Sequence, residues 1–194
     1  MIDYRDNWQA VKNAAMNTIG KDTGQYPSSE WKHKILLAEH SPIRLLEYTF
    51  VIHDLPYWVS VHITRHWLGI EHFVSTQRTD RTGEDRTKKT QDAPVTHRIR
   101  VNAQALINIS RKRLCSAASP ETKKAWHDVI TCLAMKEPEI ASVCVRECIY
   151  RGFCPELKPC GFCKTGQFAD ERLRYVKWKE AVKRASGTTT DSAT

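Results

Sequence analysis

Residues 46–69 read LEYTFVIHDLPYWVSVHITRHWLG, and this stretch carries the pattern that decides the fold. In its first part, residues 46–53, aromatic and β-branched side chains alternate with their neighbours. Side chains two positions apart lie on the same face of a strand, so Tyr48, Phe50 and Ile52 would share one face. The pattern therefore predicts a β-strand.

The second part of the stretch is predicted to be a helix. Asp54-Leu55-Pro56 has the form of a helix start, with proline near the first position that it favours, and Gly69 is a suitable stop. A helix from Asp54 to about Trp67 places two histidines, an arginine and a tryptophan on one face: Trp58, His62, Arg65 and His66. A strand is the competing prediction, because Val59, Val61 and Ile63 alternate.

Helical spacing recurs along the rest of the chain. Helices are expected at residues 6–19, from Ser28 or Ser29 onward, and at 102–114, 120–136, 138–150 and 169–185. Residues 79–98 are polar and charged, which predicts a long loop of the kind that is usually functional or mobile. One face of the helix at 102–114 carries Asn102, Leu106, Ile109 and Arg113. That face would suit a long ligand.

The bulk composition bounds the class of protein. The chain has 194 residues, of which 41% are hydrophobic and 27% charged, which indicates one globular domain. No stretch approaches the roughly 18 to 20 apolar residues that span a membrane, and the start, Met1 to Arg5, lacks the apolar core of a signal peptide. A cytoplasmic protein is therefore expected. The net charge of +8 favours an anionic partner, either nucleic acid or a small polyanion such as a nucleotide.

The seven cysteines concentrate towards the end of the chain. Cys144 and Cys148 are one helical turn apart, as two buried helix thiols would be. The later cysteines lie among prolines and glycines, and residues 160–163 form a CxxC knuckle. A structural zinc ion would have four thiolate ligands here: Cys148, Cys154, Cys160 and Cys163. Buried thiols and a redox CxxC are the alternatives, the latter without the thioredoxin-like βαβ context.

Four blocks of the sequence carry a family resemblance. Arg65-His66-Trp67, then seven residues, then Ser75 resembles the Arg-His-Arg, seven residues, Ser signature of the FAD-dependent thymidylate synthases. The other blocks follow the family's order: Asn13-Ala14-Ala15 with Gly20-Lys21; His40-Ser41-Pro42 with Tyr48-Thr49-Phe50; and Asn102-Ala103 with Leu106, Asn108 and Arg113. Together they extend from about residue 11 to residue 113.

The resemblance implies a fold, an assembly and an activity. The fold would be α/β, a mixed sheet flanked by helices like that of the thymidylate synthase-complementing proteins. The active sites would lie between the subunits of a homotetramer. The enzyme would use FAD and NADPH to transfer a one-carbon unit from methylenetetrahydrofolate to C5 of dUMP, giving dTMP. The synthase-like domain would span residues 1–150, followed by a Cys/Pro/Gly-rich segment with a basic helix at 151–186 and a disordered tail at 187–194.

The resemblance also implies roles for individual residues. Arg113 would lie at the uracil edge and favour ionisation of the ring, because a fixed guanidinium stabilises an anion beside it. The expected cofactor-binding residues are His40, Arg65, His66, Trp67, Asn102, Gln104 and Asn108. The expected dUMP-binding residues are His62, Arg65, Phe73, Val74, Ser75, Thr76, Gln77, Arg78, Arg86 and Arg113. Arginine suits these roles because it makes bidentate contacts to phosphate and to a polarised ring edge.

Several positions depart from the family pattern. Where the family has arginine, the chain has Met16, Trp67, Gln77 and Gln104; His62 replaces a glutamine, and His72-Phe73 replaces an Asn-Glu pair. Lost cationic contacts would alter the binding of flavin and nucleotide. A flavoprotein that makes a different C5-modified pyrimidine nucleotide is therefore the alternative function. A zinc-stapled, basic nucleic-acid-binding protein is the alternative from another class, although nucleic acid is not the expected partner.

Overall fold

The structure is a computed structural model that describes residues 2–21 and 24–187. Four strands form one sheet in the order β1-β2-β4-β3: β1 (Ile2–Tyr4), β2 (Glu47–Pro56), β3 (Ile70–Val74) and β4 (Pro94–Asn102). Every neighbouring pair of these strands is antiparallel. The sheet is thus antiparallel rather than mixed as expected. The reason is that β4 lies between β2 and β3, which run in the same direction and do not pair with each other.

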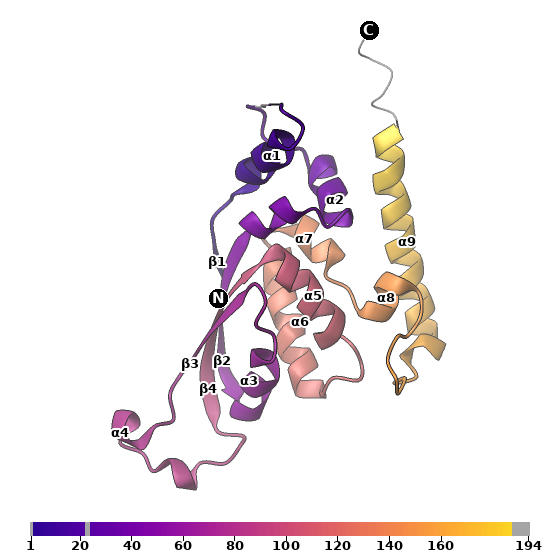
Figure 1. The fold of residues 1–194 in the computed structure, drawn as a ribbon. Coiled ribbons are helices and arrows are strands. Elements are labelled where there is room, and N and C mark those ends of the chain that lie inside the picture. Colours follow the sequence, from indigo (N-terminus) through magenta and orange to yellow (C-terminus); the bar gives the residue numbers. More distant parts are fainter. Residues whose placement is uncertain (1, 22–23, 188–194) are drawn as a thin grey trace.

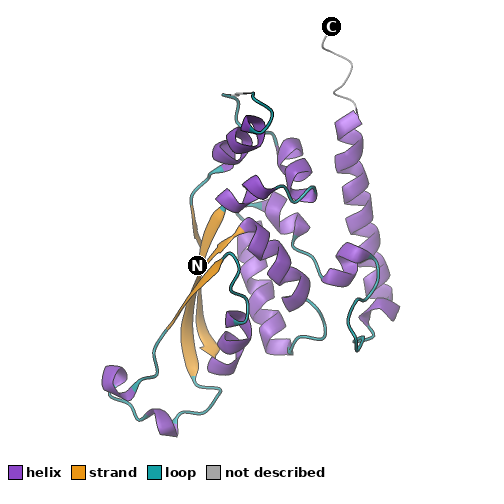
Figure 2. Cartoon of the chain, viewed as in Figure 1, coloured by secondary structure: helices purple, strands orange, loops and turns teal. Residues whose placement is uncertain are grey.

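Helices cover one face of the sheet and leave the other face open (Figures 1 and 2). The helices are α1 (Trp8–Asn17), α2 (Ser29–Leu37), α3 (Tyr57–Thr64), α4 (Thr79–Thr82), α5 (Ala103–Arg113), α6 (Pro120–Ala134), α7 (Pro138–Val143), α8 (Glu147–Arg151) and α9 (Gly166–Gly187), with short 3₁₀ turns η1 (Ser41–Leu45), η2 (Arg86–Lys88) and η3 (Phe162–Lys164). An α/β fold with flanking helices is therefore confirmed. No described helix is long and apolar enough to cross a membrane.

The core forms between the inner face of the sheet and the helices. Tyr48 and Phe50 from β2 and Ile99 from β4 are buried there. From the helices, Leu106 of α5 and Trp126 of α6 complete the contact. The indole N–H of Trp126 donates to Ser110 Oγ on α5 at 2.9 Å, so this buried polar group has a partner. This packing holds α5 and α6 in fixed positions against the sheet.

Several predicted boundaries were wrong, each for a physical reason. The expected helix at 54–67 begins only at Tyr57, because β2 continues through a bulge at residues 52–55 in which Asp54 has a positive φ of 52°. The expected loop at 79–98 contains the start of β4, whose alternation is obscured by charged residues. The expected helix at 138–150 breaks after Val143, where Val145 N donates to the Val143 carbonyl. Strands β1, β3 and β4 were not predicted.

The C-terminal helix ends the described part of the chain. The helix expected at 169–185 is α9, which begins at Gly166 and ends at Gly187. It packs on α2, α8 and η3 and lies along one side of the molecule (Figure 1). Residues 188–194 of the expected disordered tail lie outside the described residues.

Candidate active site

A cluster of two arginines and two histidines lies where the C-terminal end of α5 meets the end of α3. Arg113 Nε donates to His66 Nε2 at 2.8 Å, and Arg113 Nη2 donates to the His62 carbonyl oxygen at 2.7 Å. His62 Nδ1 lies 3.1 Å from Thr122 Oγ1 on α6. Arg65 caps the C-terminal end of α3. We call Arg65, Arg113, His62 and His66 the arginine–histidine cluster.

The protonation state of His66 follows from its partner. A guanidinium has no acceptor, so His66 Nε2 must accept the hydrogen bond and the ring must be neutral, with its proton on Nδ1. Burial, and then the charges of Arg113 and His72, lower the pKa of His66 to about 4. A neutral His66 presents its Nδ1–H as a donor at neutral pH.

Two further histidines support this arrangement from beneath. His72 Nε2 donates to the His66 carbonyl oxygen at 2.6 Å, which leaves His72 Nδ1 to accept from His97 Nε2 at 3.1 Å. His97 is fully buried, and its Nδ1 has no partner. Burial, and then the charge of His72, lower the pKa of His97 to about 4. The chain of contacts fixes the backbone at His66.

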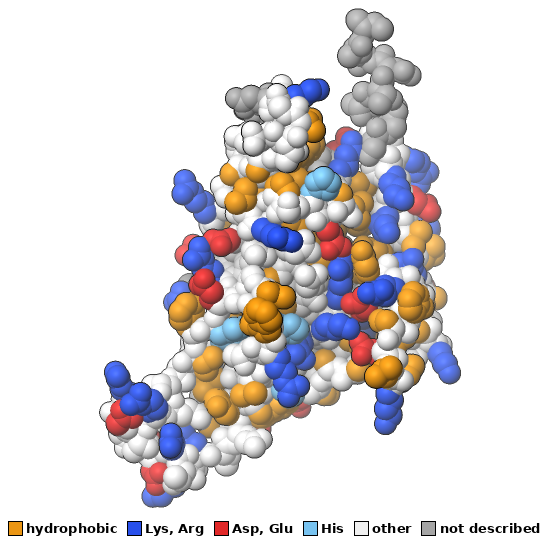
Figure 3. Space-filling view, viewed as in Figure 1, with side chains coloured by type: hydrophobic (Ala, Val, Ile, Leu, Met, Phe, Trp, Pro, Cys, Tyr) orange, Lys and Arg blue, Asp and Glu red, His pale blue; other side chains and the backbone are white. Residues whose placement is uncertain are grey.

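The electrostatics of the cluster favour an anion. Neither Arg65 nor Arg113 forms an ion pair within residues 2–21 and 24–187. Burial, and then the charge of Arg65, lower the pKa of Arg113. The same two arginines add to burial in lowering the pKa of His62. Two unopposed guanidinium groups near one another are a site for a phosphate or another delocalised anion. Histidine and basic side chains gather around exposed hydrophobic groups near the centre of the face in Figure 3.

The face of α5 that was expected to bind a ligand packs into the hydrophobic core instead. Leu106 and Ile109 are buried in the core, and Asn102 is the N-cap, whose Oδ1 accepts from Ala105 N at 2.9 Å. A long ligand cannot lie across buried leucine and isoleucine. Of that face, only its two ends reach the surface: Arg113 in the cluster, and Asn102 beside Trp67 in a small cavity of about 230 Å³.

Gly69 holds the connection between the signature and β3. It has a φ of +71°, and a Cβ there would lie 2.6 Å from Asn102 Nδ2. Gly69→Ala is expected to destabilise the protein by about 1 to 3 kcal/mol, since it adds backbone strain and displaces the α5 cap. Gly161→Ala is the matched control: its φ is +83°, but no atom lies within 4 Å of an added Cβ. Urea unfolding should show a larger loss of unfolding free energy for Gly69→Ala than for Gly161→Ala. Equal losses would contradict the predicted contact between the added Cβ and Asn102.

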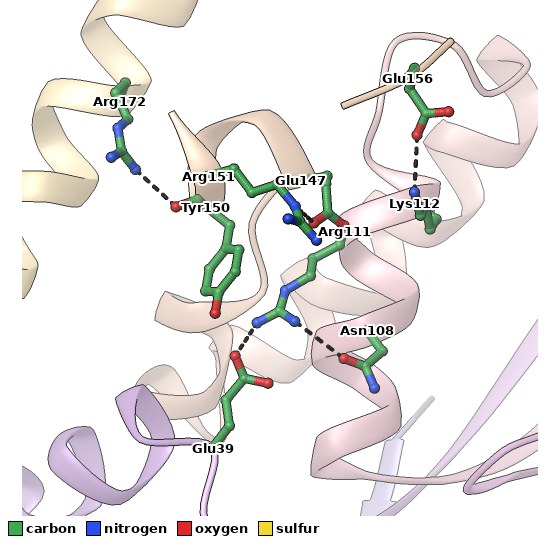
Figure 4. Close-up of polar contacts among 9 residues, drawn as sticks. All are labelled: Glu39, Asn108, Arg111, Lys112, Glu147, Tyr150, Arg151, Glu156 and Arg172. Atoms are coloured by element: carbon green, nitrogen blue, oxygen red, sulfur yellow. Dashed lines mark hydrogen bonds and ion pairs between the residues drawn. The ribbon is translucent and has the colours of Figure 1, made fainter. Parts of the chain in front are cut away.

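A second polar group lies on the next face of α5 (Figure 4). Glu39 pairs with Arg111 and accepts from Gln104 Nε2 at 2.9 Å. Asn108 Oδ1 accepts from Arg111 Nη1 at 3.3 Å. The guanidinium of Arg111 lies over the Tyr150 ring at 3.8 Å. Burial opposes ionisation of Glu39, but Arg111 and Gln104 outweigh it and lower the pKa of that carboxyl. Two of the three expected flavin-binding amides, Gln104 and Asn108, are thus linked through Glu39 and Arg111, whereas Asn102 lies apart as the N-cap of α5. Exposed His40 follows Glu39 in the chain.

The expected phosphate loop leaves the sheet at the end of β3. Phe73 faces the open side of the sheet and is 56% exposed, whereas Val74 packs against the core. Ser75 extends the pairing with β4: its N donates to the Thr96 carbonyl at 2.9 Å and its Oγ accepts from Thr96 N at 3.0 Å. The Ser75 hydroxyl is therefore committed to the backbone as an acceptor, although it retains its own proton to donate.

The rest of this loop forms an arm, residues 76–93, that projects from the molecule (Figure 1). Arg78 pairs with Asp80, with Nη2 2.6 Å from Oδ2, and Thr76 Oγ1 accepts from Arg78 N at 3.2 Å. The Nε2 amide of Gln77 is buried without a partner. Arg86 is exposed at the start of η2. Among the described residues, none of these side chains forms a hydrogen bond or ion pair with the arginine–histidine cluster.

Some residues of the site were not predicted from the sequence. His97, Glu39 and Arg111 hold predicted residues in place, but no motif marks them. The signal for His97 was present: Val95, His97, Ile99 and Val101 alternate in β4, so a strand prediction would have placed His97 on the inner face.

The expected zinc site is not formed. Among the described residues no group of three or more His, Cys, Asp or Glu side chains is arranged to hold a metal ion. The thiols interact in pairs: Cys163 interacts with Cys148, Cys154 and Cys160, and Cys160 also interacts with Cys115 just after α5. Burial, and then the neighbouring Cys163, raise the pKa of Cys148 to about 12, so this thiol stays protonated at neutral pH.

Comparisons with known proteins identify the fold. No family model and no curated protein matches the sequence, but solved structures do. The UMP/dUMP methylase PolB from Streptomyces cacaoi, bound with 5-Br dUMP, is similar with a TM-score of 0.57 and 13% identity over 79% of this chain and 95% of PolB.

Two structures of the flavin-dependent thymidylate synthase ThyX from Helicobacter pylori, both with FAD and dUMP, give TM-scores of 0.59 and 0.61. Their identities are 12% and 11%, over 74% of this chain and 96% and 97% of ThyX. The fold expected from the sequence is confirmed: the chain has the fold of the flavin-dependent thymidylate synthase ThyX and of the methylase PolB.

Proposed function

We propose that the protein is a flavin-dependent enzyme that transfers a one-carbon unit to C5 of a pyrimidine nucleotide, with dUMP as substrate and dTMP as product. The unopposed pair Arg65 and Arg113 beside neutral His66 carries the proposal, because it provides charge for an anion and a neutral donor in one place. The one-carbon donor is methylenetetrahydrofolate and the reductant is NADPH. The fold shared with ThyX and PolB supports this chemistry.

Arg113 has the role of holding the uracil ring. Two of its N–H groups are committed to His66 and to the His62 carbonyl, which fixes the orientation of the guanidinium. Its remaining N–H groups form no hydrogen bond with another described residue and are available to a ligand. A preorganised cation beside the uracil edge stabilises negative charge on the ring, and this charge makes C5 nucleophilic.

Some of the expected cofactor-binding residues are free to contact FAD, and others already have partners within the chain. Arg65 is exposed and has no ion-pair partner within the described ranges, so it can pair with a phosphate of the dinucleotide. Trp67 is 73% exposed and offers an aromatic face. Gln104 and Asn108 keep amide groups near His40, although Glu39 and Arg111 already use part of their capacity. When bound, FAD supplies the hydride chemistry that side chains lack.

A homotetramer explains why the arm and the cluster are separate within one chain. The open face of the sheet carries exposed Phe73, and exposed Trp67 and Leu68 lie just before β3. Exposed apolar side chains of this size are typical of a subunit contact. In such an assembly the arm of a neighbouring subunit, with Arg78, Arg86 and the unpartnered Gln77 amide, would bring its donors to the nucleotide phosphate.

The first test is flavin binding. Purified protein should bind FAD, seen by absorbance and by isothermal titration, and Arg65→Ala should weaken binding by about 1 kcal/mol or more if the contact is charge-assisted. Lys177→Ala, an exposed cation on α9, is the control and should bind FAD as the parent does. If the parent protein takes up no FAD, the proposal fails.

A different C5 product is the second candidate. Trp67, Gln77 and Gln104 stand where the resemblance expects arginines, so the cationic contacts are fewer than in the family pattern. Tritium release from C5-labelled dUMP, together with a C5-modified nucleotide other than dTMP identified by mass spectrometry, would support this candidate.

A further inference from the structure

A second cavity lies away from the arginine–histidine cluster, between α6 and α9. Its volume is about 640 Å³, within the range of roughly 300 to 1,000 Å³ typical of small-molecule sites. Helix α6 forms one wall, α9 the other, and the segment around Val145 and Ile149 joins them. The cavity therefore depends on α9, which lies beyond the part of the chain that carries the family resemblance.

The inner surface of this cavity is mostly apolar. Leu114, Val145 and Ile149 contribute aliphatic groups. Tyr175 and Trp178 of α9 contribute stacked rings, with centroids 5.7 Å apart and an interplanar angle of 28°. A flat ring system is the kind of group that such a surface accommodates, because aromatic side chains pack on planar faces.

Most of the charged side chains that line the cavity are cationic. Four cationic side chains and a single carboxylate line it: Lys123, Lys124, Arg146, Arg174 and Glu171. Glu171 is already neutralised by Arg146, with Nε 3.4 Å from Oε2, and Lys124 pairs with Asp128 at 2.7 Å.

Two cations remain, one on each wall. Within the described residues, the side chains of Lys123 on α6 and Arg174 on α9 have no hydrogen-bond or ion-pair partner. An apolar cavity with two uncompensated cations at its edge is complementary to a ligand with an apolar body and an acidic end.

We propose that the cavity between α6 and α9 binds a small planar organic anion, an aromatic ring system that carries a carboxylate, sulfonate or phosphate group. The ring lies against Tyr175 and Trp178, and the acidic group lies between Lys123 and Arg174. This site is separate from the nucleotide site, because no residue of the arginine–histidine cluster lines the cavity. The inference does not depend on the proposed function.

The probe for this site is 8-anilinonaphthalene-1-sulfonate, an aromatic sulfonate with a planar naphthalene ring that fluoresces in apolar surroundings. The full chain should bind it saturably, at one site per chain, with energy transfer from tryptophan that Trp178→Phe reduces. The double variant Lys123→Glu/Arg174→Glu should weaken binding at least about tenfold. The control Lys177→Glu/Lys183→Glu makes the same change of charge on exposed lysines of α9 that do not line the cavity, and should bind as the parent does.

Other results would overturn the proposal. Equal weakening by both double variants would show that only overall charge matters. Equal binding of the uncharged N-phenyl-1-naphthylamine would show that an acidic group is not needed.

The location of the probe has its own test, in which Lys123→Glu/Arg174→Glu is the cavity variant. Loss of probe binding in Arg113→Ala but not in the cavity variant would place the probe at the nucleotide site. If the parent chain binds no probe, and light scattering shows assemblies that dissociate in the cavity variant, then a second copy of the chain covers the cavity. Circular dichroism shows whether each variant is folded. If the glutamate variant does not fold, the milder double variant Lys123→Ala/Arg174→Ala is used to repeat the binding test.

Discussion

Arg113→Ala is expected to lower the turnover of dUMP by about a hundredfold to a thousandfold while the protein still binds flavin. The effect follows from the loss of a fixed cation beside the charge that develops on the uracil ring. Flavin binding should persist because Arg65 and the amides of Gln104 and Asn108 remain in place. The measurement is tritium release from C5-labelled dUMP with FAD, NADPH and methylenetetrahydrofolate, alongside the flavin absorbance of the same sample.

The controls separate chemistry from structure, because Arg113 also contacts His66 and the His62 carbonyl. Lys112→Ala removes the neighbouring exposed cation of α5, which pairs with half-buried Glu156 at 3.0 Å, and should keep full turnover. Arg113→Lys keeps the charge but loses the planar fork, so an intermediate rate is expected. Equal tritium release from the parent and from Arg113→Ala would show that the active site lies elsewhere.

The fold was predictable where side-chain periodicity and helix caps agree. Strand β2 and helix α5 show this: Tyr48 and Phe50 alternate into the core, and Asn102 caps α5 as a helix start should. Strands β3 and β4 were missed because their outward positions carry Glu71, Arg98 and Arg100, which make the segments read as polar. One face of an antiparallel sheet can be polar, so composition alone conceals such strands.

The residues of the arginine–histidine cluster could be predicted from the sequence, but their contacts could not. The resemblance indicated Arg65, His66 and Arg113, and the structure brings them together at the ends of α3 and α5. It did not indicate that Arg113 donates to His66, nor that buried His97 lies below it. These contacts join residues far apart in the chain, and only the packing of α5 against the sheet creates them. The four cysteines expected to bind zinc do not form a metal-binding group among the described residues, and their spacing alone did not indicate that Cys160 interacts with Cys115.

The free energy of unfolding is expected to decrease as the pH is lowered from 6.5 to about 4, because of His66 and His97. The pKa of His97 falls from its ordinary value of 6.5 to about 4 on folding, as does that of His66. Between these pH values the unfolded chain binds protons at these histidines and the folded chain does not, so the free energy of unfolding decreases as the pH falls. Above pH 6.5 both states are neutral at these residues, and their contribution to stability is complete.

The contribution of His97 can be isolated, because it is fully buried. Its shift corresponds to about 3 kcal/mol, at about 1.4 kcal/mol for each pKa unit. Glu137 opposes the trend in part, because burial raises the pKa of its carboxyl and the folded state then gains protons. His97→Gln keeps a donor for His72 but does not titrate, so it should flatten the dependence of unfolding free energy on pH by about one proton. His53→Gln, at an exposed position on β2, should leave it unchanged. Urea unfolding from neutral pH to pH 4 measures both variants. An unaltered slope in His97→Gln would mean that His97 is not held neutral in the fold.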